Sequence, residues 1–431
     1  MNALPRAIDP RSVIVVGAGV IGTSCAFVLQ GRGYAVTLVD RLEPGEACSF
    51  GNAGVIATSA CVPLILPGTL RKAPSWLLDR DGPLAVDWRY LPTLMPWIGR
   101  AWRAAGLARV RAAAMALRDL HGTAADDHLA QAAEANCGHL IAKSDYLHVY
   151  RSSAALAEDR LAWELRRELG LHWRELDAGA LREVEPALGD QFECGVLMHG
   201  HAAAPDPGAL VKALAKAFAL RQGRYLRASV TALRSTEHGV IAETSAGRQS
   251  AAHVVLAAGA WSAELAWSLG HRFPLVAERG YHVVYGEPGI QLRQPVMFAE
   301  TKFVAHSMNA GLRCAGTAEF AAPDRPLRPA RVAAIERVAK AALPGLQTNE
   351  ATSWVGARPS LPDTLPVIGR SHLHPRVVFA FGHGHTGLTA SAKTARIVAD
   401  IVAGEPPSID IAPFRPDRFS ARAATRRRGR R

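Results

Sequence analysis

The glycine-rich segment of residues 17–22 has the spacing that binds the pyrophosphate of a dinucleotide. It reads Gly17-Ala18-Gly19-Val20-Ile21-Gly22, and it lies between a predicted strand at 13–16 and a predicted helix that ends near residue 31. The first glycine allows a tight turn, the second lets the backbone approach the phosphates, and the third lets helix and strand pack closely. A second predicted strand, 36–39, ends in Asp40, whose carboxylate would accept hydrogen bonds from a ribose. The free N–H groups and the positive dipole at the start of the helix would bind the phosphates. Together these features predict an adenine dinucleotide site.

Two more predicted strands end in small residues, far along the chain. Strand 253–256 runs into Ala-Ala-Gly-Ala-Trp at 257–261, and strand 377–381 runs into Gly-His-Gly-His-Thr-Gly at 382–387. A nicotinamide dehydrogenase usually keeps its nucleotide-binding strands close in sequence, whereas a flavin that extends through the molecule needs close backbone approach at several points. The helix that begins near Gly387 offers a positive pole to the flavin pyrimidine edge, where reduction places negative charge. The pattern favours FAD, with ordinary tight turns as the alternative.

The composition is that of an ordinary enzyme. A chain of 431 residues suggests about two or three domains, and 49% apolar with 20% charged residues excludes a disordered protein. The six cysteines form no C-x-x-C pair, so we expect free thiols in a reducing compartment and no metal site. We expect no signal peptide, because the first strand begins so early, and no apolar stretch of roughly 18 residues that could span a membrane. These features predict a cytoplasmic protein, with residence on the inner face of a membrane as the alternative.

The net charge of +12 is concentrated at the end of the chain. Residues 421–431 contain six arginines and no acid. We expect residues 417–431 to form a disordered basic tail, either solvated without a partner or attracted to an anionic membrane surface, each cation contributing about 1 kcal/mol there. Only this tail favours nucleic acid, and we expect no nucleic-acid partner.

The remaining elements are predicted from periodicity and from Gly and Pro positions. Helices are expected at about 106–136, 154–169, 207–220, 331–343 and 388–402, and strands at 146–150, 230–233 and 240–244. Residues 63–105 are rich in proline and tryptophan, which suggests an irregular, well-packed excursion or an amphipathic surface.

Over residues 11–419 the chain resembles the FAD-dependent D-amino-acid dehydrogenase family, within the larger group of D-amino-acid oxidase, glycine oxidase and sarcosine oxidase. The matching blocks are 13–40, SFGNAGVIA at 49–57, VVLAAGAWS at 254–262, ERGYHV at 278–283, GARPSLPDTLPVIGR at 356–370 and FAFGHGHTGL at 379–388. SFGNAG favours the dehydrogenases over the oxidases. The resemblance implies an α/β fold with a Rossmann-type FAD-binding domain, formed by 1–95, 203–262 and 352–416. It also implies a mixed α+β substrate domain, formed by 96–202 and 263–351, whose sheet covers the flavin.

The resemblance assigns residues to a non-covalently bound FAD. The pyrophosphate loop matches residues 17–22, named above, and the adenosine end matches Asp40 and Arg41. Further cofactor contacts are implied for Ser49, Asn52, Ala53, Gly54, Val230, Ala258, Gly259, Gly382, His383, Gly384, Gly387 and Leu388.

Three residues are implied at the substrate. Arg358 lies in the Gly-x-Arg-Pro segment, whose arginine in related oxidases binds the amino acid α-carboxylate through two parallel charge-assisted bonds. Tyr281 lies where relatives have an active-site tyrosine, although a core tyrosine is the alternative. His385 lies where glycine oxidase has a second active-site arginine, and this departure makes a transfer of substrate preference unsafe.

The implied reaction is oxidative deamination of a D-amino acid. Hydride passes from Cα to flavin N5, and the imino acid is hydrolysed to a 2-oxo acid and ammonia, so the protein supplies mainly orientation and electrostatics. The electron acceptor is a quinone, a carrier protein or oxygen. The alternatives are a glycine- or sarcosine-type amine oxidase, a D-hydroxyproline dehydrogenase, and a non-enzymatic flavoprotein subunit that depends on a partner.

Overall fold

The computed structural model describes residues 8–420 and contains two large sheets. Its helices are α1 (Val20–Gly31), α2 (Thr69–Leu78), α3 (Leu91–Ala104), α4 (Leu107–His121), α5 (Ala124–Glu134), α6 (Ser153–Glu158), α7 (Arg160–Glu168), α8 (Ala178–Val184), α9 (Pro207–Leu220), α10 (Ser262–Trp267), α11 (Pro329–Ala342) and α12 (Gly387–Ala403). Within residues 8–420, no helix has both the length and the apolar character needed to cross a bilayer.

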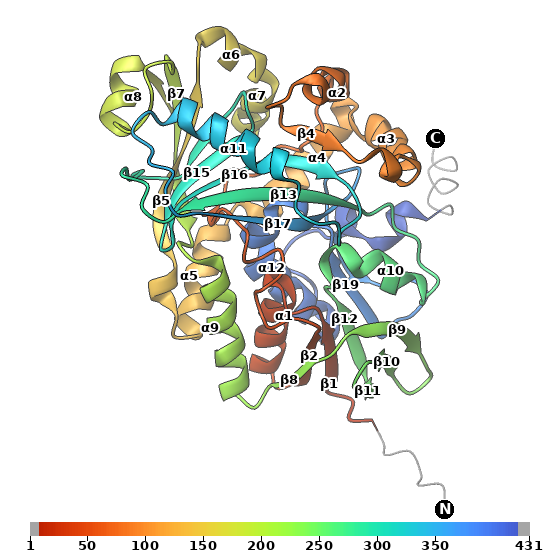
Figure 1. The fold of residues 1–431 in the computed structure, drawn as a ribbon. Helices are drawn as coiled ribbons and strands as arrows, with labels where there is room; N and C mark the ends of the chain where they lie inside the picture. The colour runs from red at the N-terminus through yellow and green to blue at the C-terminus, as the bar shows by residue number, and fades with distance from the viewer. Residues whose placement is uncertain (1–7, 421–431) are drawn as a thin grey trace, which may run out of the picture.

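The first sheet has six strands in the order β18-β19-β12-β1-β2-β8. They are β1 (Ser12–Val16), β2 (Ala35–Asp40), β8 (Arg224–Arg227), β12 (His253–Leu256), β18 (Val367–Arg370) and β19 (Val377–Phe381). All neighbours are parallel except β18 and β19. Because β1 lies between β12 and β2, segments that are distant in sequence end side by side at one edge of the sheet. Helix α1 packs against α12 and α9 on this sheet (Figure 1), which confirms the expected α/β class.

A small antiparallel sheet of β9 (Val230–Ser235), β10 (Val240–Thr244) and β11 (Gly247–Ala251) lies beside the first. Its apolar side chains, among them Leu233 and Val240, pack in one buried cluster with Val254 and Phe379 of the six-stranded sheet. The strands expected at 230–233 and 240–244 are present as β9 and β10, whereas the strand expected at 253–256 is β12 of the six-stranded sheet. The N–H of Ala228, two residues before β9, donates to the carbonyl of Asp40 at the end of β2.

The second large sheet has ten strands. Eight follow in the order β17-β13-β16-β15-β14-β5-β7-β3, while β4 pairs with β16 and β6 pairs with β7. Their bounds are β3 (Val55–Ile56), β4 (Leu84–Val86), β5 (Ala142–Tyr150), β6 (Arg174–Asp177), β7 (Cys194–Ala203), β13 (Val276–Tyr285), β14 (Val296–Phe298), β15 (Phe303–Met308), β16 (Gly311–Phe320) and β17 (Ala351–Ser360). Helix α11 lies across β13 and β16 (Figure 1).

Some strands that were expected in the FAD-binding domain pair with the ten-stranded sheet instead. β3, β4 and all of β17 except its first residue fall in the ranges 1–95 and 352–416 that were assigned to the FAD-binding domain, yet all three pair with strands of the ten-stranded sheet. The exact domain boundaries stay a prediction. The pairing of β17 with β13 matters for the site, because it carries Arg358 next to Glu278.

The remaining differences from the expected elements have local causes. The helical region expected at 106–136 is present as two helices, α4 and α5, separated at Gly122 and Thr123. Residues 63–105 contain α2 and α3 despite the internal Pro74 and Pro96. Residues 416–419 of the C-terminal region form a 3-10 helix in which Arg418 binds Asp363, so 417–420 are folded, and residues 421–431 lie outside the described part.

Candidate active site

A cavity of about 390 Å³ lies at the carboxyl ends of β1, β2, β12 and β19. Residues from all three glycine-containing turns meet on its wall. Of the residues expected to contact the cofactor, those that line it are Gly17, Gly19, Val20, Ile21, Asp40, Arg41, Ser49, Asn52, Val230, Ala258, Gly259, Gly382, His383, Gly384, Gly387 and Leu388. The parallel register of the sheet explains this convergence, because the ends of neighbouring parallel strands lie at one edge.

The first glycine loop has no room for side chains at two of its positions. Gly17 has φ +107°, and a Cβ there would lie 2.3 Å from the carbonyl oxygen of Ala257. A Cβ on Gly22 would lie 1.7 Å from the carbonyl oxygen of Gly17. By contrast, a Cβ on Gly19 would meet only the Ser49 hydroxyl, at 3.5 Å, so this glycine keeps the backbone open toward the cavity. The loop thus has the division of roles that the sequence motif predicts.

The side chains of Asp40 and Ser49 accept hydrogen bonds from the backbone of this loop. The Asp40 carboxylate accepts the N–H of Ala18 at 2.6 Å and the N–H of Leu42 at 2.9 Å. Each carboxylate oxygen retains a second lone pair for a hydroxyl group in the cavity. The Ser49 hydroxyl accepts the N–H of Val20 at 2.9 Å, at the N-terminus of α1. Arg41 lies over the ring of Trp261 at 4.2 Å, so both residues form the outer end of the cavity.

Four of the expected cofactor residues lie behind the wall. Ala18 binds Asp40, and Gly22 packs on the loop as described above. The carbonyl of Ala53 accepts a hydrogen bond from His306 at 2.7 Å. Gly54 has φ +76°, and a Cβ there would lie 2.3 Å from the carbonyl oxygen of Ala204. These residues shape the wall without facing the cavity.

The third turn presents the N-terminus of α12 to the cavity. Gly382 and Gly384 have φ values of +84° and +54°. Among the described residues, no side chain forms a capping hydrogen bond at the N-terminus of α12. The His383 ring is buried, and its Nε2 lies 3.1 Å from the Thr394 hydroxyl. Burial, with a smaller contribution from the charge of His121, lowers the pKa of His383 to about 3. His383 is therefore neutral near pH 7, and the positive charge at this end comes from the helix dipole.

A buried carboxylate that was not among the expected site residues lies beside the cavity. Glu278 of β13 has its Oε1 2.5 Å from His385 Nε2 and 3.4 Å from Arg358 Nη1, and its Oε2 accepts a hydrogen bond from Ser360 at 2.7 Å. Burial alone would raise the pKa of Glu278, but the charges of His385 and Arg358 and the hydrogen bonds from His385 and Ser360 lower it to about 2. Glu278 is therefore ionised near pH 7.

Arg358 is held loosely beside the cavity, although neither it nor His385 is among the residues that line the cavity. Besides the 3.4 Å contact with Glu278, Nη1 lies 3.5 Å from the carbonyl oxygen of Thr317, and 21% of the side chain is exposed. Both contacts are longer than a well-formed charge-assisted hydrogen bond, so the guanidinium is free to take a closer anion. Its chain neighbours Ala357 and Pro359 line the cavity. Burial raises the pKa of the Cys48 thiol on the cavity wall, and the charge of Arg358 partly offsets this rise.

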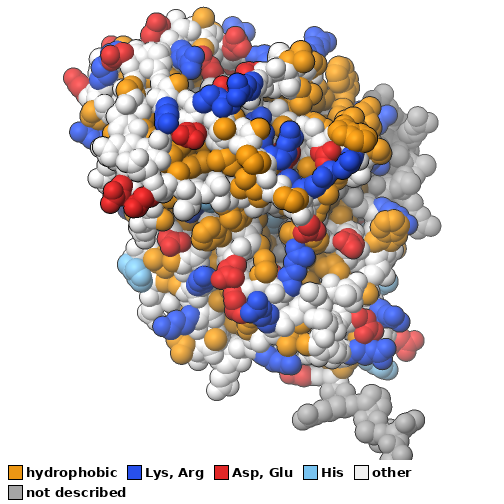
Figure 2. Space-filling model, viewed as in Figure 1, with side chains coloured by type: hydrophobic (Ala, Val, Ile, Leu, Met, Phe, Trp, Pro, Cys, Tyr) orange, Lys and Arg blue, Asp and Glu red, His pale blue; other side chains and the backbone are white. Residues whose placement is uncertain are grey.

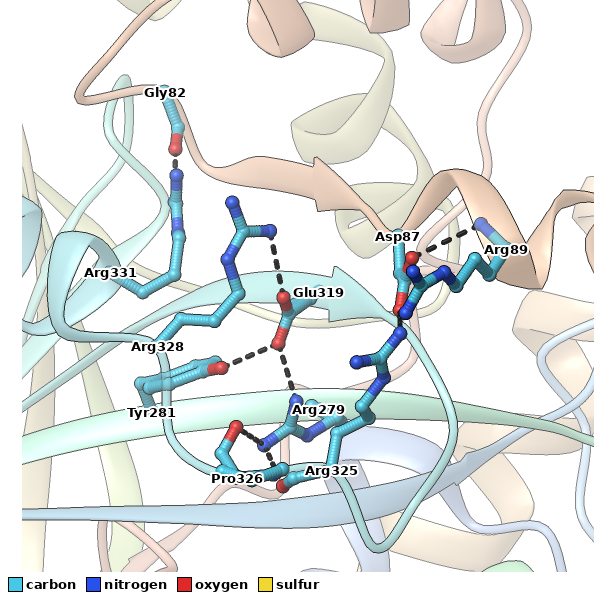
Figure 3. Close-up of polar contacts among 10 residues, drawn as sticks. All are labelled: Gly82, Asp87, Arg89, Arg279, Tyr281, Glu319, Arg325, Pro326, Arg328 and Arg331. Carbon is cyan, nitrogen blue, oxygen red and sulfur yellow. Dashed lines mark hydrogen bonds and ion pairs between the residues drawn. The ribbon is translucent and has the colours of Figure 1, made fainter.

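Tyr281 does not line the cavity, contrary to the expectation of a pocket-lining ring. Successive side chains of a strand point to opposite faces, so Tyr281 lies on the face of β13 away from Glu278. Its hydroxyl donates to Glu319 at 2.5 Å, and Arg279 and Arg328 donate to the same carboxylate (Figure 3). Burial and Glu319 raise the pKa of Tyr281 to about 12. This position is that of a core tyrosine, the alternative that the sequence left open.

The sequence contained one signal for Glu278. It stands in ERGYHV, inside a strand whose residues are all buried, and a carboxylate is seldom fully buried unless it is paired. The pairing partners, however, lie on β17 and after β19, and only the register of the folded sheet brings them together.

Known proteins resemble this chain over nearly its whole length. The profile described as "FAD dependent oxidoreductase" matches residues 12–401. A protein of Bradyrhizobium diazoefficiens named "D-amino-acid oxidase" is 38% identical over 95% of this chain and 99% of its own length. A "D-amino acid dehydrogenase" of Paramagnetospirillum magneticum is 33% identical over 95% of this chain and 99% of its own.

Solved structures share the fold at lower identity. Glycine oxidase from Geobacillus kaustophilus superposes with a TM-score of 0.72 at 22% identity, covering 94% of this chain and 98% of that one. L-proline dehydrogenase from P. horikoshii has a TM-score of 0.71 at 15% identity, covering 96% and 98%. The family profile spans most of the chain and both large sheets, and FAD as the cofactor is thereby confirmed. The chain belongs to the family of FAD-dependent oxidoreductases.

Proposed function

We propose that the protein catalyses the FAD-dependent oxidative deamination of a D-amino acid. The observation that carries this proposal is the loosely held Arg358, which lies between the cavity-lining residues Ala357 and Pro359 and would offer a guanidinium to a carboxylate. The relatives that cover nearly the whole chain are named for D-amino acids, which supports the same substrate class.

The residues of the cavity fit FAD. The glycine loop and the N-terminus of α1 would hold the pyrophosphate, Asp40 would accept the ribose hydroxyls, and the start of β9 would lie against the adenine. At the opposite end, the uncapped N-terminus of α12 would face the flavin pyrimidine edge. When bound, FAD supplies the hydride acceptor, and the protein supplies placement.

Arg358 and Glu278 would act on the substrate by charge. The guanidinium of Arg358 would bind the α-carboxylate and so fix the orientation of Cα. Because Glu278 is ionised, it balances the positive charge of Arg358 before the substrate enters, and it orients His385 through the 2.5 Å contact. His385 is 37% exposed, so solvent reaches its ring. The imino acid product is hydrolysed by water to the 2-oxo acid and ammonia.

The electron acceptor distinguishes a dehydrogenase from an oxidase. We propose a quinone or carrier protein, because SFGNAG at 49–54 resembles the dehydrogenases. Sustained peroxide formation in air with a D-amino acid would favour oxygen instead, and reduction of a dye or quinone without peroxide would support the proposal.

Replacement of Arg358 tests the substrate assignment. Arg358→Ala should lower kcat/KM roughly 30- to 5,000-fold, a loss of about 2–5 kcal/mol, because it removes the cation that would bind the substrate carboxylate. The matched control is Arg376→Ala, since Arg376 is an arginine whose contact is the carbonyl of Glu237 at 3.4 Å. Equal kcat/KM values in the two variants would remove Arg358 from the substrate site.

A further inference from the structure

Arg166 of helix α7 is a partly buried cation that forms no ion pair within residues 8–420. The two acids of the same helix are engaged elsewhere, since Glu164 pairs with Arg160 at 3.2 Å and Glu168 pairs with Arg111 at 2.8 Å. Burial lowers the pKa of Arg166, because its charge is removed from water. A desolvated charge without a counter-charge is costly, so an anion bound at this position would be stabilising.

One edge of the Arg166 guanidinium is free for a ligand. In the described part of the chain, Nη1 donates to the carbonyl oxygen of Ala162 at 3.3 Å, and the buried Nε has no partner. The Nε and Nη2 groups of an arginine lie along one edge as two parallel donors, which match the two oxygens of a carboxylate. The guanidinium lies over the ring of Trp163, with Cζ 4.5 Å from the ring centre. Trp163 thereby fixes the plane in which an anion would be bound.

Three polar side chains of the ten-stranded sheet surround this cation, Tyr146 and His148 of β5 and His201 of β7, and together with it they form what we call the Arg166 site. The ring centres of His148 and Trp163 are 5.3 Å apart, those of Tyr146 and His148 are 4.8 Å apart, and those of Tyr146 and His201 are 6.1 Å apart. The charge of Arg166 acts on all three polar side chains. All three are buried, and none lines the FAD cavity, so the Arg166 site is separate from the candidate active site.

The Arg166 site offers hydrogen bonds but no second positive charge. Burial raises the pKa of Tyr146, so its hydroxyl keeps its proton and can donate. Burial lowers the pKa of His201 to about 4, and its Nδ1 accepts the N–H of Thr58 at 3.1 Å, so the ring is neutral and its proton lies on Nε2. Burial also lowers the pKa of His148, whose buried Nε2 has no partner among the described residues. One positive charge among neutral groups suits an anion with a single charge.

The surface around α7 carries charges of both signs. Figure 2 shows Lys and Arg side chains interspersed with Asp and Glu at the end of the molecule where Figure 1 places α6, α7 and α8. Lys302 and Asp159, whose charges also reach the site, lie 3.6 Å apart as an ion pair. An extended basic surface therefore does not attract the anion here, and recognition would depend on Arg166 and its neighbours.

We propose that the Arg166 site binds a small monocarboxylate anion. The two carboxylate oxygens would accept the parallel N–H groups of Nε and Nη2, and the Tyr146 hydroxyl would donate to one of the same oxygens. The aromatic rings of the site favour a ligand with one charge and an apolar body over a multiply charged one such as inorganic phosphate. Because Arg166 is separate from Arg358, occupancy of this site does not depend on the proposed deamination.

Fluorine NMR of trifluoroacetate with the FAD-bound Arg358→Ala protein tests this proposal. This parent variant removes the other proposed carboxylate site, so a broadened fluorine resonance reports on the Arg166 site. Acetate should reverse the broadening, and chloride at the same concentration should not. Arg166→Gln should weaken binding about tenfold or more, because two charge-assisted hydrogen bonds are lost. The matched control is Arg167→Gln on the same helix, whose exposed guanidinium lies 5.2 Å from the ring centre of Trp173 and which should bind like the parent.

A second variant keeps the outcome decisive where Arg166→Gln does not fold. Tyr146→Phe retains the ring and should weaken trifluoroacetate binding about three- to tenfold. No binding by the parent, or binding that neither Arg166→Gln nor Tyr146→Phe weakens, would overturn the proposal. So would displacement by chloride as readily as by acetate, which would indicate an adventitious ion only, or displacement by inorganic phosphate and not by acetate. None of these measurements follows turnover, so their failure is distinct from a failure of the proposed reaction.

Discussion

Glu278→Gln should change how stability depends on pH. The pKa of Glu278 is lowered from an ordinary 4.5 to about 2 in the folded protein. Each pKa unit corresponds to about 1.4 kcal/mol, so ionised Glu278 contributes about 3 kcal/mol to the free energy of unfolding. Because the folded pKa is the lower one, this contribution is complete above about pH 5 and is lost as the pH falls toward 2.

Urea unfolding of wild type and Glu278→Gln at several pH values measures this contribution. The variant keeps the side-chain size and can still bond to Ser360 and His385, but it cannot titrate. The difference in free energy of unfolding between the two proteins should shrink by about 2 kcal/mol between about pH 6 and pH 3. Other carboxylates are common to both proteins, so their titration cancels in the difference.

A difference that stays constant over this pH range would refute the reasoning. It would mean that Glu278 titrates alike in the folded and unfolded chains, and hence that His385, Arg358 and Ser360 do not stabilise its charge. The site would then lack the ionised carboxylate that balances Arg358 in the proposed function.

The remaining predictions concern Asp40 and Tyr281. Asp40→Ala should weaken FAD retention and lower the free energy of unfolding by about 1–3 kcal/mol, because the Ala18 N–H loses its acceptor; flavin absorbance after gel filtration measures retention, and full occupancy would contradict the ribose role. Tyr281→Phe should lower the free energy of unfolding by about 1–3 kcal/mol, since Glu319 loses one donor, and leave kcat/KM unchanged. A large fall in kcat/KM at wild-type stability would return Tyr281 to the active site.

The nucleotide-binding part of the fold could be predicted because its signals are local. The strand before Gly17, the helix after it and the strand ending in Asp40 lie within one short stretch, and the structure has them as β1, α1 and β2. The two later turns were found the same way, since Gly259 and Gly384 each follow a buried apolar strand.

The substrate side of the site could not be predicted in the same way, because it depends on register. Arg358 and Glu278 stand opposite each other only through the pairing of β17 with β13. Whether residue 278 or 281 faces the cavity depends on which face of β13 is turned toward it, and a fully buried strand gives no alternation to show this. The helices α2 and α3 were missed because Pro74 and Pro96 argue locally against a helix.

The most direct test of the account is to follow the visible flavin band of the purified protein without oxygen while D- and L-amino acids are added one at a time. D-isomers should bleach the flavin and their L-counterparts should not, and bleaching should be slower or absent in Arg358→Ala. Bleaching by L-isomers, or a bound flavin that no amino acid reduces, would contradict the proposed reaction.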